Sequence, residues 1–152
     1  MMALRVDQRT PTAYSLDTYN KVLALSKHVL SVAKPKEPKP NNKHVPKRFV
    51  GIANMMTECV VEIGADILEA NEIYVGANVR DEILWERYKA RIALEEEAKR
   101  KTYRLEHIFR MLYYEIGFAD STATYMIDLI GEVRAALSKW TESDKRAMSG
   151  KR

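Results

Sequence analysis

The sequence predicts an all-α protein, and three observations lead to this prediction. Apolar residues recur at intervals of three and four positions over long stretches, which is the spacing of one face of an α-helix. The 152 residues include only 6 Gly and 5 Pro, so the chain has little turn-forming material. No segment alternates apolar and polar residues as a half-buried strand does. We therefore expect an antiparallel four-helix bundle.

The first helix is expected over residues 16–33, after a flexible N-terminal arm of residues 1–14. Ser15 can cap its amino end, and Lys34-Pro35 can end it because the residue before a proline disfavours the helical conformation. Its apolar face is predicted to contain Leu16, Tyr19, Leu23 and Leu30, with Val22 and Val29 beside them. A second helix is expected from near Pro46 to Val75-Gly76, where Gly76 and Asn78 can adopt left-handed conformations. Its apolar face contains Phe49, Ile52, Ala53, Met56, Val60, Ile63, Ile67, Ala70 and Tyr74.

The third helix is expected to begin at Asp81 and to end at Gly117, which makes it the longest and leads it to project beyond the bundle. Its polar middle, residues 95–104, is predicted to face solvent. Asp120 or Ser121 can cap a fourth helix that runs to Thr141. The bundle is thus expected over residues 15–141, followed by a polar basic tail of residues 142–152. The fourth helix buries a predicted stripe of Met126, Leu129, Ile130, Val133, Leu137 and Trp140.

Positive charge is concentrated in one segment of the chain. Between Lys34 and Arg48, six basic residues stand against Glu37 alone, a local charge of +5. The remaining residues carry about −1, because the whole chain carries +4. The segment is rich in proline and runs into a predicted helix amino end, whose dipole favours phosphate. The charge pattern indicates an anionic partner; the alternative is that the segment only increases solubility.

A second group of basic residues lies on the third helix. The predicted nucleic-acid-binding residues of the two groups are Lys34, Lys36, Lys39, Lys43, Lys47, Arg48, Arg87, Arg91, Arg100 and Arg104. Tyr103, Tyr113 and Tyr114 alternate with Arg104 and Arg110, a pattern that can stack bases beside phosphate contacts, although such tyrosines more often belong to a core or an interface.

The sequence offers no set of residues typical of catalysis or metal binding. None of His28, His44 and His107 follows a Glu at three residues, as the ligands of di-iron bundles do. The sequence contains no glycine-rich phosphate loop. Cys59 is expected to be buried and to pack in the core. We therefore expect no enzyme activity, metal or cofactor. The single cysteine, with no signal-peptide or transmembrane pattern, leads us to expect a cytoplasmic protein.

Three stretches resemble a known family. The fourth helix from Leu129 (LIGEV) to Trp140, the aromatic turn Tyr113–Phe118 (YYEIGF), and residues 61–71 (VEIGADILEAN) are similar to the accessory variability determinant (Avd) proteins of diversity-generating retroelements. This four-helix-bundle family includes proteins encoded in ribosomal-RNA intervening sequences. The resemblance covers residues 16–141 and extends to the basic segment after the first helix. The family often has Gly-Arg after the Glu-aliphatic pair of the fourth helix, where this chain has Arg134 and Ala135.

The resemblance implies that the bundle assembles into a positively charged homopentameric barrel that binds RNA or DNA. It also implies that the protein binds the retroelement's reverse transcriptase and supports its mutagenic copying of a template RNA, without chemistry of its own. A pentamer would also account for apolar residues away from the main stripes, such as Val22, Met55 and Tyr113. The alternative is a four-helix module that binds RNA or another protein and has no link to a reverse transcriptase.

Overall fold

The chain forms four α-helices packed as a bundle, as the periodicity predicts. The structure, a computed structural model, describes residues 13–33 and 49–150. The helices are α1 (Ala13–Ala33), α2 (Val50–Glu72), α3 (Asp81–Ile116) and α4 (Asp120–Ser149). None of the helices in the described ranges is both long and apolar enough to cross a membrane.

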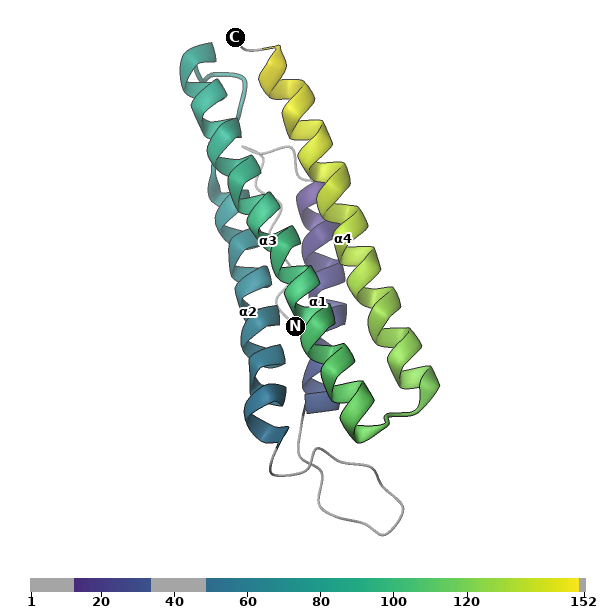
Figure 1. The fold of residues 1–152 in the computed structure, drawn as a ribbon. Helices are drawn as coiled ribbons and strands as arrows, with labels where there is room; N and C mark the ends of the chain where they lie inside the picture. The colour runs from purple at the N-terminus through teal and green to yellow at the C-terminus, as the bar shows by residue number, and fades with distance from the viewer. Residues whose placement is uncertain (1–12, 34–48, 151–152) are drawn as a thin grey trace.

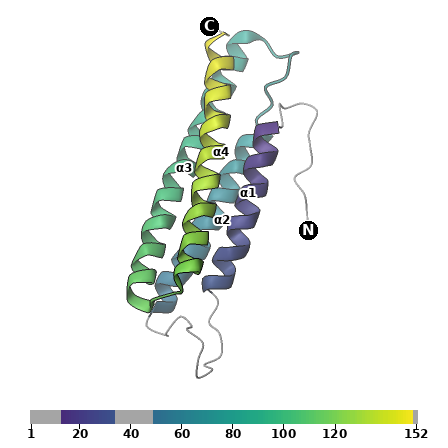
Figure 2. The same ribbon diagram turned by 90° about the vertical axis from the view of Figure 1, so that its right-hand side faces the viewer.

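Each helix packs against two neighbours in a closed cycle. α2 and α4 both contact α1 and α3, so α1 and α3 lie diagonally across the bundle. Figures 1 and 2 show successive helices running in opposite directions. The carboxyl end of α1, the amino end of α2 and the α3–α4 turn therefore lie at one end, which we call the turn end. The connection from α2 to α3 and the carboxyl end of α4 lie at the opposite end, the connector end.

The bundle is asymmetric because α3 and α4 continue beyond α1. At 36 residues α3 is the longest helix, about 54 Å at 1.5 Å per residue, and α1 has only 21 residues. The prediction of a long third helix is thus confirmed. Beyond α1, a small second core fills the space between the connector and the two long helices. It contains Val75, Leu84 and Tyr88, with Ile73, Val79, Ala147 and Met148 packed against it.

The buried face of α1 differs from the predicted one. Val22, Leu25 and Val29 enter the core, whereas Leu30 is exposed. Ser15, the expected cap, is buried within the helix, which begins at Ala13. The helix carries two overlapping apolar stripes, and packing against α2 and α4 selects the one in line with Ser15 and Thr18. Val22 is therefore a core residue and needs no partner subunit to cover it.

Two helix ends also differ from the predictions. α2 ends at Glu72, and residues 73–80 form the connector, in which neither Gly76 nor Asn78 has a positive φ. α4 continues past Thr141 to Ser149, so residues 142–149 of the predicted polar basic tail are helical. The extension is stabilised because Asp144 accepts two hydrogen bonds from Arg91 of α3 and because Ala147 and Met148 pack on the second core. The predicted stop of α3 is confirmed: Gly117 adopts a left-handed φ of 73°.

Candidate functional site

The first group of predicted nucleic-acid-binding residues (Lys34, Lys36, Lys39, Lys43, Lys47 and Arg48) lies outside the described residues. The helices on either side of it are described. α1 ends at Ala33 and α2 begins at Val50, both at the turn end of the bundle. The first turn of α2 contains no acidic residue, so no carboxylate offsets the positive end of its dipole.

Arg91 was predicted to bind nucleic acid, and the structure corrects this prediction. The residue is 1% exposed, and its side chain lies between α3 and α4. Nε donates to Oδ2 of Asp144 at 2.8 Å, and Nη2 donates to Oδ1 of Asp144 at 2.5 Å. The guanidinium also lies over the rings of Tyr88 and Trp140. A buried, doubly bonded guanidinium cannot contact a phosphate in solvent, so Arg91 is a structural residue.

Glu95 completes a buried polar layer between the main core and the second core. It was expected to face solvent, but it is 0% exposed, and Thr141 donates a hydrogen bond to its Oε1 at 2.9 Å. Its Oε2 lies 3.7 Å from Nε of Arg91. Burial, together with the neighbouring Asp144 carboxylate, raises the pKa of Glu95 to about 10. Glu95 is therefore neutral at pH 7, and the layer contains one buried cation and one buried anion.

Arg87 also lies in surroundings that disfavour a phosphate. It is half-buried, and its Nη1 donates to the carbonyl oxygen of Tyr74 in the connector at 3.0 Å. The exposed carboxylates of Glu82 and Glu86 stand on the same turns of α3. Negative charge around Arg87 repels nucleic acid, so the basic group predicted on the third helix is not a single patch.

The second half of α3 carries a continuous exposed face of basic and aromatic side chains. We call it the arginine–tyrosine face; its members are Arg100, Tyr103, Arg104, His107, Arg110, Met111 and Tyr114. Each of these positions has another member of the set three or four residues away, so they share one side of the helix. All seven side chains are exposed, Tyr114 to 89%. Arg100 and Arg104 of the predicted residues thus lie together, on a face that leads to the turn end.

Arg134 of α4 positions one tyrosine of this face. Its guanidinium carbon lies 3.7 Å from the centre of the Tyr103 ring, while Nε donates to Thr102 and Nη2 donates to Glu106, each at 3.1 Å. Arg110 donates to the other carboxylate oxygen of Glu106 at 3.1 Å. These two hydrogen bonds lower the pKa of Glu106 although its partial burial opposes them, so Glu106 is an anion that holds both arginines in place.

The cysteine and the described histidines are not arranged for catalysis or metal binding. Cys59 is buried and its thiol donates to the carbonyl oxygen of Lys101; burial raises its pKa. His107 is exposed, and His28 packs edge-on against Tyr125. Among the residues that the structure describes, no three His, Cys, Asp or Glu side chains are grouped so that they could hold a metal ion.

No family model, no curated protein and no solved structure matches this chain. The structure shows an all-α domain of four helices packed as a bundle.

Sequence reasoning missed part of the candidate site. Met111 and His107 complete the arginine–tyrosine face, and the three-and-four spacing from Tyr103 to Tyr114 is a signal that could have found them. Arg134 is placed 32 residues from its Thr102 acceptor, so no local pattern indicates its contact with Tyr103.

Proposed function

We propose that this protein is a non-catalytic nucleic-acid-binding subunit and that it contacts RNA or DNA through the arginine–tyrosine face of α3 and the basic segment of residues 34–48. The observation that carries the proposal is the exposed row that brings Arg100, Arg104 and Arg110 together with Tyr103 and Tyr114. Guanidinium groups bind phosphate, and tyrosine rings stack on bases of any sequence.

Several features of this face favour a single-stranded or structured nucleic acid. Each exposed ring lies within one turn of an arginine, which is the arrangement that follows a backbone and its unstacked bases. Arg134 holds the Tyr103 ring, so less side-chain freedom is lost when a base stacks on it. Within the described residues Arg104 makes no ion pair, and the Arg100–Glu97 pair is exposed, so a phosphate can displace it at small cost.

We also propose the role of an accessory subunit of a retroelement reverse transcriptase, working as a homopentamer. The support is the similarity of residues 61–71, 113–118 and 129–140 to Avd proteins, together with the four-helix fold. Co-expression with the reverse transcriptase of a diversity-generating retroelement tests this role: a complex that survives gel filtration is expected. Nucleic-acid binding without such a complex would favour the module with no link to a reverse transcriptase.

A salt titration of nucleic-acid binding tests the proposed interface. The dissociation constant for a fluorescent single-stranded RNA is measured at several salt concentrations, for the natural chain and for a Lys36→Gln, Lys39→Gln, Lys43→Gln variant. Loss of three phosphate contacts should flatten the plot of log affinity against log salt by about 2 to 3, at about 0.7–0.9 for each contact. A Tyr103→Ala, Tyr114→Ala variant should weaken binding with little change in the slope, because stacking releases no counterions.

The matched control is Lys27→Gln. Lys27 is exposed on α1, diagonally across the bundle from α3, so its loss should leave both the affinity and the slope unchanged. Melting temperatures verify that each variant is folded. Equal slopes for the triple lysine variant and the natural chain would mean that residues 34–48 bind no phosphate. Unchanged affinity in the tyrosine variant would remove the arginine–tyrosine face from the proposal.

A further inference from the structure

A groove of about 640 Å³ lies at the connector end of the bundle, between the end of α2, the connector and the first turns of α3. We propose that it docks a cationic amphipathic segment of a partner protein. This site is separate from the arginine–tyrosine face and does not depend on nucleic-acid binding. It combines an apolar floor with a rim of carboxylates, and these two properties define the chemistry of the occupant.

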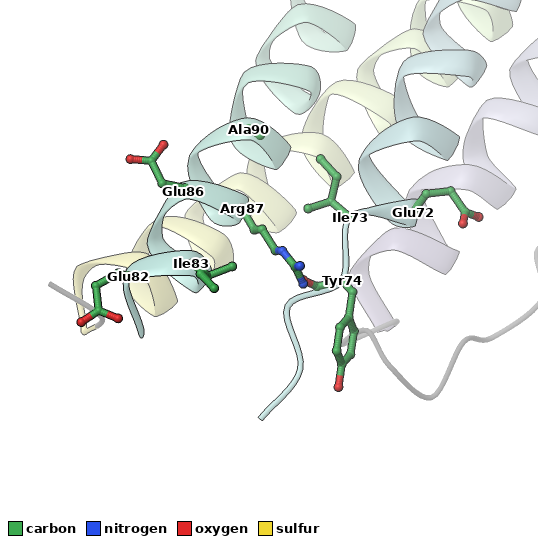
Figure 3. Close-up of a pocket in the computed structure, with 8 residues that line it drawn as sticks. All are labelled: Glu72, Ile73, Tyr74, Glu82, Ile83, Glu86, Arg87 and Ala90. Atoms are coloured by element: carbon green, nitrogen blue, oxygen red, sulfur yellow. The ribbon is translucent and has the colours of Figure 1, made fainter. Parts of the chain in front are cut away.

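The floor of the groove is made by side chains from both helices. Ile73 follows α2, and Ile83 and Ala90 lie on the first three turns of α3. Figure 3 shows Ile73 and Ile83 in the space between the two chain segments. Both isoleucines are only partly buried, so they present apolar surface that an apolar side chain of a partner would cover. The volume suits several side chains rather than a single ion.

Carboxylates stand on both sides of this floor. Glu72 lies on the α2 side, and Glu82 and Glu86 lie on the α3 side (Figure 3). All three are exposed, and among the described residues none of them forms an ion pair. The last turn of α2 contains no basic residue, so the negative end of its dipole adds to the field of these carboxylates. Arg87, the one cation in the lining, is held by the Tyr74 carbonyl oxygen.

The directions of the carboxylates identify the type of ligand. In Figure 3 Glu72 points away from Glu82 and Glu86, so the three groups do not converge on one point as metal ligands would. They flank the floor instead, where long lysine or arginine side chains of a segment seated on Ile73 and Ile83 would reach them. Nucleic acid is disfavoured because its phosphates would meet these carboxylates. The groove therefore fits an apolar stripe flanked by basic residues.

Fluorescence anisotropy with a synthetic peptide tests this docking site. The probe is a labelled amphipathic peptide of leucine and lysine, and the reference peptide has glutamate in place of lysine. The natural chain should bind the lysine peptide and not the reference peptide. A Glu72→Gln, Glu82→Gln, Glu86→Gln variant should raise the dissociation constant about eightfold, at roughly twofold for each exposed ion pair lost. Ala90→Trp, which fills the groove without adding charge, should also weaken binding.

Two matched controls separate the groove from the general charge of the protein. Glu58→Gln, Glu62→Gln, Glu69→Gln removes three exposed carboxylates of α2 that do not line the groove, and Ala93→Trp adds an indole to α3 outside it. Neither control should change the dissociation constant. Equal losses in the test and control variants would overturn the proposal. A fall in the light-scattering mass of the groove variant alone would also overturn it, because the occupant would then be a second copy of this chain.

Discussion

Arg91 and Asp144 form a buried ion pair whose two members depend on each other. Each charge would be costly in the core by itself, and the two hydrogen bonds between them offset that cost. Asp144→Ala should therefore reduce the free energy of unfolding by about 3–5 kcal/mol, since it leaves a buried guanidinium without an anion. Urea denaturation followed by circular dichroism measures this change.

The double variant Arg91→Met, Asp144→Leu serves as the test of this explanation. It replaces both charges with apolar groups. Its free energy of unfolding should therefore be no more than about 1 kcal/mol below that of the natural chain. Asp128→Ala, an exposed carboxylate on the same helix, should change stability by less than about 0.5 kcal/mol. If the double variant were as unstable as Asp144→Ala, the loss would come from packing rather than from an unpaired charge.

Glu95 should make the stability of the protein depend on pH. Its pKa is about 10 in the folded chain and near 4.5 when the chain is unfolded, so between these values only the folded state holds the proton. The stability from this proton is fully present below about pH 4.5 and is lost as pH rises through the folded pKa.

The measurement is a series of urea titrations between about pH 6 and pH 9. The natural chain should lose stability relative to Glu95→Gln, which remains neutral, by up to about 1.4 kcal/mol per pH unit. Glutamine keeps an acceptor for Thr141, so the difference in stability between the two proteins should be smallest at the acidic end of the range. Parallel pH profiles would show that Glu95 is ionised in the folded protein.

At the scale of elements, Gly117 and Gly131 differ in whether the backbone requires a glycine. Gly117 ends α3 with a φ of 73° and donates its N–H to the carbonyl oxygen of Tyr113 at 2.8 Å. Gly117→Ala should destabilise the protein by about 1–2 kcal/mol, because an L side chain is strained in this conformation. Gly131 lies inside α4, where an added Cβ would meet nothing within 4 Å. Gly131→Ala should stabilise the protein by about 0.5–1 kcal/mol. Thermal melts of both variants measure the difference, and effects of the same sign would contradict this account.

At the scale of the whole molecule, the two ends of the bundle differ in charge. The groove at the connector end has an acidic rim. The arginine–tyrosine face leads to the turn end, where α1 ends and α2 begins on either side of residues 34–48. This polarity would allow a nucleic acid and a cationic protein segment to bind at the same time without sharing a surface. It would also steer the two proposed kinds of partner to different places.

Exposed apolar residues lead us to predict that the protein assembles with copies of itself. Val61 on α2 is 63% exposed, and Met55 on the same helix is 40% exposed. Light scattering should give a mass several times the 17.5 kDa of one chain, five times if the assembly is the pentamer. Val61→Asp should lower that mass, because it places a charge in an apolar contact, whereas Glu62→Gln should not. A mass of one chain for the natural protein would contradict the prediction.

The sequence by itself determined the number of helices, the Gly117 turn, the length of α3 and the close grouping of Arg100, Arg104 and Tyr103. Each of these features depends on the periodicity or the backbone conformation of a single segment. Residues close together in the sequence determine both. Only the tertiary structure decided that Arg91 and Glu95 are buried, that α4 continues to Ser149, and that Ile73 and Ile83 form one groove. Arg91 and Asp144 are 53 residues apart, and their pairing depends on how α3 and α4 align. A polar side chain on a helix has the same local pattern whether it faces water or a buried partner, so only packing distinguishes the two.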